Sequence, residues 1–150
     1  NAPEGFELSS GSQLTRIPVA EEAASLSAIL LDADYYAFLK TMGRSLDGVP
    51  VLDEAGLIPF KARAWVDLSR RRAEGEQVDD RDVKKHRNDV ARLLQLLSAQ
   101  ATFDLPEKIK ADMQAFIDAL AGQDDFTPKQ FGVAMTREVV IDRLRHAYNL

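Results

Sequence analysis

The chain contains no cysteine and only two histidines, His86 and His146. The absence of cysteine excludes a disulfide scaffold, a thiolate zinc site and a cysteine nucleophile, and it gives no reason to expect an oxidising compartment. Two histidines are too few to form a histidine-rich metal site. The sequence therefore points away from disulfide-rich secreted domains and from zinc-dependent folds.

Long apolar runs are also lacking. No stretch approaches the roughly 20 apolar residues that cross a bilayer, and the first residues carry neither the basic nor the apolar region of a signal peptide. We therefore expect a cytoplasmic protein with no membrane partner. Asn1 and Ala2 resemble the remnant of a cleaved tag, and we expect residues 1–13 to be this remnant and an exposed, serine-rich lead-in.

The composition is that of one folded domain. The 150 residues are 45% hydrophobic and 29% charged, which is enough to bury a sizeable core, and we expect residues 14–150 to form it. A net charge of −5 speaks against bulk nucleic-acid binding. Residues 61–92, however, hold ten Lys or Arg side chains against seven acidic ones, which indicates either a phosphate-facing surface or, more commonly, a solvated helical face.

Local patterns predict an α+β fold that is mostly helical, with a small β-rich N-terminal segment followed by a body of four to five helices. Leu14 to Val19 and Val49 to Leu52 are the strand candidates. Asp32 is expected to cap a helix from Ala33 that Gly43 ends.

The rest of the chain has the three- and four-residue apolar spacing of helices. In the second of these helices the apolar stripe includes Val83, Val90 and Leu93, and we expect Trp65 and Leu68 of the first to pack against it. The predicted starts are Pro59 in a first helical turn, Asp79 or Asp80 as a cap, Asp104 with Glu107 as a capping box, and Thr127 followed by Pro128 at the last helix.

One pattern resembles a metal site. Gly11-Ser12 followed by Asp32 and Asp34 has the elements with which a nucleotidyltransferase holds a triphosphate and two magnesium ions. The two halves lie too far apart for that arrangement, and Asp34 leads into a helical pattern. A loop and a helix cap explain these residues more simply.

A second pattern lies on two successive helices. Lys61 borders the buried side of its helix, and Asp82, Lys85 and Asp89 share one face of the next at spacings of three and four. If the two helices pack antiparallel, Lys61 and Asp89 approach each other. Such a pair could hold a phosphate or a metal-bound nucleotide, or it could be a lysine beside a surface carboxylate.

Three segments carry a resemblance to a known family. Residues 25–36 (SLSAILLDADYY), 57–68 (LIPFKARAWVDL) and 82–90 (DVKKHRNDV) are similar to bacterial nucleotidyltransferase-like proteins related to the AbiEii abortive-infection toxins. The resemblance extends over about residues 14–120. In that family the catalytic Gly-Ser turn and the metal-binding carboxylates precede the matched region.

The resemblance implies that this chain is the C-terminal, substrate-side helical domain of a longer protein and is inactive as a fragment. By position it makes Lys61 and Asp89 catalytic and Lys85 and Asp82 substrate-binding, on the rim of an exposed cleft, with no metal ligand in this chain. It implies Mg²⁺ and a nucleoside triphosphate for the full-length protein. Its implied partners are the protein's own N-terminal catalytic domain, an antitoxin protein and an RNA acceptor. The alternative is a helical protein-interaction module without a nucleotide role.

Overall fold

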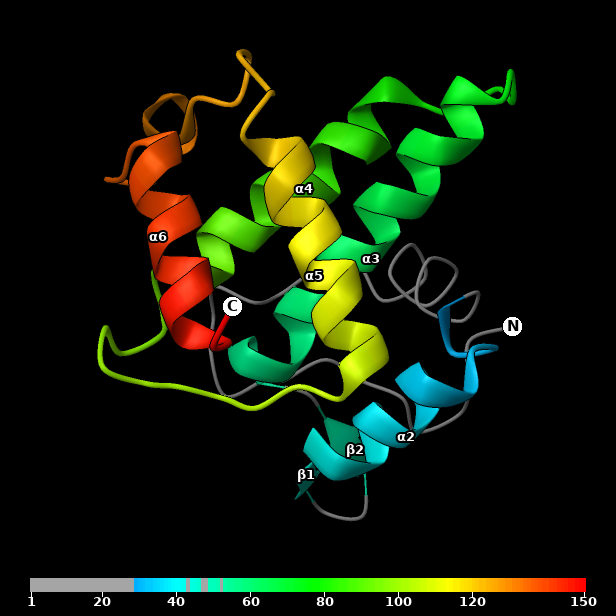
Figure 1. The fold of residues 1–150 in the computed structure, drawn as a ribbon, viewed down its shortest axis with the longest axis vertical. Coiled ribbons are helices and arrows are strands. Elements are labelled where there is room, and N and C mark those ends of the chain that lie inside the picture. The colour runs from blue at the N-terminus through cyan, green and yellow to red at the C-terminus, as the bar shows by residue number, and fades with distance from the viewer. Residues whose placement is uncertain (1–28, 43, 47–48, 52) are drawn as a thin grey trace.

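The computed structural model describes residues 29–42, 44–46, 49–51 and 53–150, and this part of the chain is built from helices (Figure 1). A single antiparallel pair of short strands, with Arg44 opposite Val51 and Leu46 opposite Val49, precedes the main helices among these residues. The elements in chain order are α2 (Ala33–Met42), β1 (Arg44–Leu46), β2 (Val49–Val51), α3 (Glu54–Ala73), α4 (Asp80–Leu94), α5 (Glu107–Leu120), the 3-10 helix η2 (Pro128–Phe131) and α6 (Arg137–Ala147).

The expected α+β class with a β-rich start is therefore wrong for the described residues, which are helical. β1 and β2 have three residues each, and a pair of that size cannot provide a face against which helices pack. The strand candidate Leu14 to Val19 lies outside the described residues. The strand expected from Val49 to Leu52 is represented by β2, which ends at Val51.

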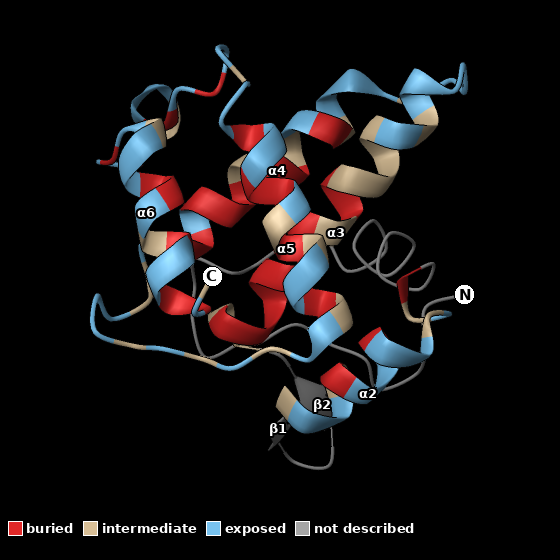
Figure 2. Cartoon of the chain, viewed as in Figure 1, coloured by how far each residue is buried: buried red, intermediate tan, exposed pale blue. Residues whose placement is uncertain are grey.

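Helices α3 and α4 form the centre of the fold. α3 packs against α4 and α5, and α6 contacts both α4 and α5, so that the buried faces of all four helices turn toward one another (Figure 2). Trp65 is buried and packs edge-on against Phe116 of α5, with ring centroids 5.5 Å apart, while Leu68 is partly buried against the core. The expected stripe of α4, including Val83, Val90 and Leu93, is buried.

Several predicted helix ends are confirmed. Asp32 accepts a hydrogen bond from the backbone N–H of Asp34 (2.8 Å) at the start of α2, and Asp79 accepts one from Arg81 (2.9 Å) at the start of α4. After α3, Gly75 adopts a φ of +94°, a left-handed conformation that favours glycine and ends the helix.

Three predicted starts differ from the structure. α3 begins at Glu54 behind an Asp53 cap, so Pro59 lies inside the helix. Asp104 caps no helix, because its carboxylate accepts a hydrogen bond from Asn149 (2.9 Å). The last helix is divided in two: Gly132 turns the chain after η2 with a φ of +89°, and Thr136 then caps α6.

No helix in the described residues is both long enough and apolar enough to cross a membrane.

Leu93→Ala should lower the free energy of unfolding by about 2–5 kcal/mol, because Leu93 is buried and its truncation leaves a cavity in the core. Arg72→Ala, which removes an exposed cation paired with Asp80, should change it by less than about 1 kcal/mol. Denaturant unfolding monitored by circular dichroism measures both values. Equal effects of the two substitutions would show that the buried face of α4 has been assigned incorrectly.

Candidate functional site

The structure brings together the two residues at the centre of the predicted site. Lys61 of α3 and Asp89 of α4 form an ion pair, with Lys61 Nζ 3.1 Å from Asp89 Oδ2. The pairing follows from helix geometry: both residues border the buried stripes of two antiparallel helices joined by a short turn. Sequence spacing therefore identified a real contact between these side chains.

The environment of this pair differs from the expected exposed cleft. The Lys61 side chain is 0% exposed and that of Asp89 is 10% exposed, so the pair lies inside the contact between α3 and α4. Two charges removed from water carry a desolvation cost that their attraction offsets only when the geometry is good. The Lys61 side chain has no surface exposed to solvent in this conformation, and its ion pair with Asp89 joins α3 to α4.

The other two predicted residues lie on preceding turns of α4. Asp82 and Lys85 are half-buried, and the helical spacing places them on the face that also carries Asp89. They reach solvent, which Lys61 does not. If a ligand approaches this face of α4, these two side chains are the ones positioned to contact it.

Asp89 also connects the buried pair to the surface. Its second oxygen, Oδ1, accepts a hydrogen bond from Arg92 (2.9 Å), whose side chain is partly exposed. The Arg92 guanidinium lies 4.8 Å from the ring centre of Phe131 in η2. A chain of contacts thus runs from Lys61 in α3 through α4 to the segment that follows α5.

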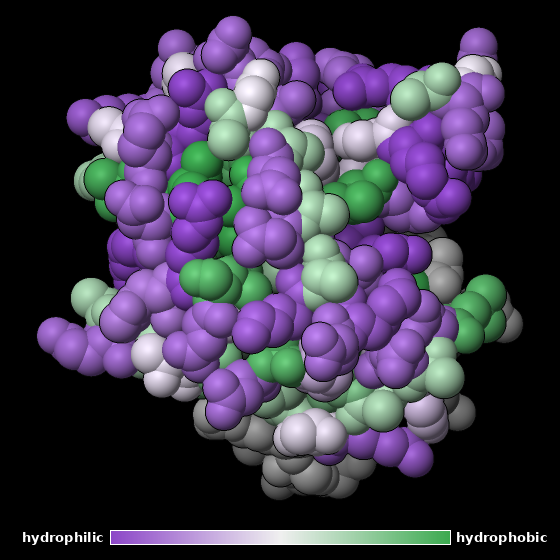
Figure 3. Space-filling model, in the orientation of Figure 1, coloured by the Kyte–Doolittle hydropathy of each residue, from purple (hydrophilic) through white to green (hydrophobic). Residues whose placement is uncertain are grey.

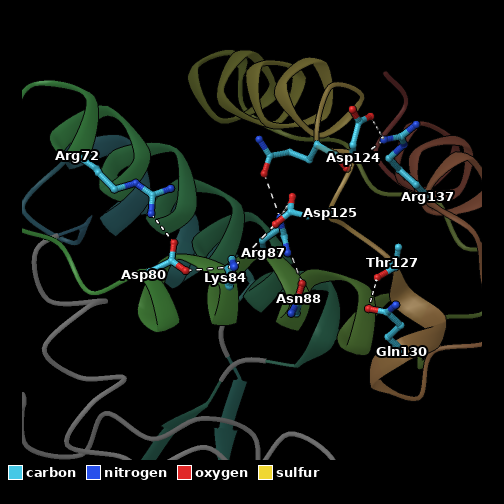
Figure 4. A network of polar contacts seen from close by, with 11 residues as sticks. Arg72, Asp80, Lys84, Arg87, Asn88, Asp124, Asp125, Thr127, Gln130 and Arg137 are labelled. Carbon is cyan, nitrogen blue, oxygen red and sulfur yellow. Dashed lines mark hydrogen bonds and ion pairs between the residues drawn. The ribbon is translucent and has the colours of Figure 1, made fainter.

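A second arginine of α4 holds the same segment, and the sequence analysis gave it no role. Arg87 is 4% exposed and donates hydrogen bonds to Gln123 and Asp125, both 3.0 Å long; Figure 4 shows Arg87 beside Asp125. Its guanidinium also lies over the ring of Phe126, at 5.2 Å. The rings of Phe126 and Phe131 also contact each other, at 6.1 Å. The arginines and the phenylalanines are each five positions apart along the chain, and this matched spacing was the available sequence signal.

The cations at the end of the α3–α4 pair are neutralised by neighbouring acids. Arg70 and Arg71 pair with Asp67, Arg72 pairs with Asp80, and Asp80 also pairs with Lys84 (Figure 4). Hydrogen bonds from Arg72 and Lys84 hold the pKa of Asp80 below its usual range. This part of the basic segment is therefore an internally paired helical surface, whereas Lys61 and Arg87 of the same segment are buried.

The carboxylates of the D-x-D pattern have structural partners. Asp32 caps α2, and its other oxygen lies 3.7 Å from Lys108 Nζ. Across the described residues, no group of three or more His, Cys, Asp or Glu side chains is arranged to hold a metal ion.

A third polar cluster joins α2, α3 and α5. The Tyr35 hydroxyl donates to Asp112 Oδ2 (2.8 Å), and the same carboxylate pairs with Arg63 (3.4 Å) and Lys108 (3.2 Å). Tyr35 is fully buried, and burial, followed by the hydrogen bond to Asp112, raises its pKa well above the ordinary value of 10.0. The cluster fixes α2 on the helical body.

A groove lies beside α6, away from the predicted residues. It has a volume of about 390 Å³ and an apolar floor of Phe126, Pro128 and Met135. Arg137 on its rim is occupied by Asp124 (3.2 Å) and Glu138 (3.1 Å).

Comparisons of this chain with protein-family models, with curated proteins and with solved structures find no match.

The burial of Lys61 and Asp89 predicts a large and non-additive effect on stability. Lys61→Met and Asp89→Leu should each lower the free energy of unfolding by about 3–5 kcal/mol, because each leaves one charge buried opposite an apolar side chain. The double variant should lose much less than the sum, because both charges are removed together. Denaturant unfolding of the four proteins gives the coupling energy.

The surface pair of Arg72 and Asp80, which joins the same two helices, is the matched control. Its double-mutant cycle with alanine should give a coupling energy below about 1 kcal/mol. A coupling energy below about 1 kcal/mol for Lys61 and Asp89 would contradict the burial of this ion pair.

The raised pKa of Tyr35 predicts a loss of stability in alkali. The unfolded chain ionises this tyrosine above pH 10 and the folded protein does not, so its contribution is complete below pH 10 and is lost as the pH rises further. Above that pH the wild type should lose about 1.4 kcal/mol per pH unit more than Tyr35→Phe. Denaturant unfolding at a series of pH values measures both slopes, and equal slopes would show that Tyr35 ionises in the folded protein.

Proposed function

We propose that this chain is the substrate-side helical domain of a nucleotidyltransferase-like protein related to the AbiEii toxins, and that it acts in the cytoplasm. The observation that supports this proposal is the meeting of Lys61 and Asp89 across two helices at 3.1 Å, since the family resemblance assigns both residues to one site. The family resemblance rests on the sequence of three segments, so the contact between Lys61 and Asp89 is a separate observation.

The burial of the pair changes the role that we propose for each residue. Lys61 and Asp89 are positioning residues that fix α3 against α4, because Lys61 is sealed from any ligand. Asp82 and Lys85 reach solvent on α4, so Lys85 is the group proposed to contact the phosphates of a nucleoside triphosphate. The described residues supply no magnesium site, and the proposed contact requires none from them.

Nucleotide binding tests this proposal, and the chain carries its own reporter. Trp65 is the only tryptophan and lies one helical turn after Lys61, so its fluorescence can follow a titration with each common nucleoside triphosphate. Lys85→Ala should weaken binding about tenfold or more, as expected for the loss of a charge-assisted contact.

The neighbouring Lys84 provides the control. It is exposed and paired with Asp80, so Lys84→Ala should leave nucleotide affinity within about twofold of wild type if α4 binds through the Lys85 face. Equal losses from the two substitutions would indicate unspecific attraction to a basic surface. The absence of saturable binding by any triphosphate would contradict the nucleotide role.

The alternative is a helical interaction module that meets an antitoxin or another protein. It is favoured by the sealed state of Lys61 and by apolar side chains left in solvent near α2, where Leu31 is 89% and Tyr36 is 49% exposed. In Figure 3 the visible face is largely hydrophilic, and hydrophobic atoms show between α5 and α6 and at the start of α2. An RNA acceptor belongs to the nucleotidyltransferase proposal, and a protein partner is compatible with both.

A further inference from the structure

α3 contains an internal proline, and this creates a gap in its hydrogen bonding. Pro59 follows Ala55 by four residues and has no backbone N–H, so it cannot donate the helical hydrogen bond to the Ala55 carbonyl. Ala55 is 3% exposed, so water does not readily replace the lost donor. A buried carbonyl without a partner would destabilise this turn of the helix.

A tyrosine from the other end of the described chain fills the gap. The Tyr148 hydroxyl donates a hydrogen bond to the Ala55 carbonyl oxygen at 2.7 Å, across 93 positions of sequence. Tyr148 is completely buried, and burial raises its pKa well above the ordinary value, so the hydroxyl keeps its proton. The donor that Pro59 removes from α3 is thus returned by the residue that follows α6.

Tyr148 is held in place by contacts on its own side. Its backbone N–H donates to Leu144 of α6 (3.1 Å), and its ring lies 5.9 Å from that of Phe103. Phe103 in turn donates a backbone hydrogen bond to Ala147 (2.6 Å). The end of α6 and the segment before α5 therefore hold the Tyr148 hydroxyl in position against α3.

We propose that Tyr148 is a latch that closes the hinge made by Pro59 in α3 and keeps the turn carrying Lys61 in its sealed position. Prolines inside helices are the usual sites of bending, and here Pro59 lies two residues before Lys61. The Lys61 turn remains closed while the end of α6 is docked. Undocking of α6 frees the Ala55 carbonyl and loosens the first turns of α3.

The test is a double-mutant cycle between the latch and the hinge. Tyr148→Phe should lower the equilibrium constant for folding about tenfold or more, because it leaves the Ala55 carbonyl buried without a donor. Pro59→Ala restores a backbone N–H that can bond to the same carbonyl. In the Pro59→Ala background, the loss caused by Tyr148→Phe should fall to a small factor, below about threefold.

Tyr35→Phe is the control, because it removes a buried hydroxyl that bonds to Asp112 of α5 and keeps the ring that contacts Phe60. Its cost should be the same in both backgrounds. Equal costs for Tyr148→Phe in the two backgrounds would overturn the latch and leave Tyr148 as an ordinary core residue. If Tyr148→Phe alone does not fold, folding of the Pro59→Ala/Tyr148→Phe protein supports the latch, and failure of both overturns it.

Hydrogen exchange locates the effect. In Tyr148→Phe the amides of Leu57, Ile58 and Lys61 should exchange at least about tenfold faster, relative to wild type, than those at the centre of α4. A uniform acceleration over all helices would show a general loss of stability and would contradict a latch that acts on α3.

Discussion

The buried ion pair between Lys61 and Asp89 is the constraint around which the helices are arranged. A lysine with no solvent access needs a carboxylate at short range, and only one relative position of α3 and α4 provides it. Apolar contacts alone would permit small shifts of one helix along the other, because they are not directional. The ion pair is directional and so fixes the relative position of the two helices. Its formation costs free energy, because two charges are removed from water.

This constraint extends outward through α4. Asp89 accepts from Arg92 on its second oxygen, and Arg92 and Arg87 hold the rings of Phe131 and Phe126 in the segment between α5 and α6. α4 therefore contacts α3 through an ion pair, and it contacts the segment between α5 and α6 through the guanidinium groups of Arg87 and Arg92. The acidic and basic side chains at the exposed ends of α3 and α4 pair with one another and add little to this arrangement.

The sequence predicted the parts of this fold that depend on local order. The caps of α2 and α4 and the buried stripe of α4 follow from residue types at fixed offsets, as does the approach of Lys61 to Asp89. The burial of that pair could not be predicted, because it depends on residues of other elements that cover it. The α+β class was wrong for the described residues, because β1 and β2 have three residues each and are too short to form a face against which helices pack.

Two of the three errors at helix starts have a common physical origin. Pro59 is a good signal for a first turn, but Tyr148 makes it tolerable inside α3 by supplying a hydrogen bond from 93 residues away. Asp104 has the right neighbours for a cap and is instead engaged by Asn149. In both cases a partner distant in sequence decided the outcome, and a local pattern contains no information about it.

The matched spacing of two arginines and two phenylalanines has a consequence for the register of α4. A displacement of that helix by one residue along its axis, about 1.5 Å with a rotation of roughly a quarter turn, would carry both guanidinium groups off their rings. The same displacement would withdraw Asp89 from Lys61. The position of α4 is thus fixed by three contacts, those of Arg87, Asp89 and Arg92 with α3 and with the segment between α5 and α6. After an insertion or deletion between Arg87 and Arg92, no shift of α4 along its axis could restore all three contacts.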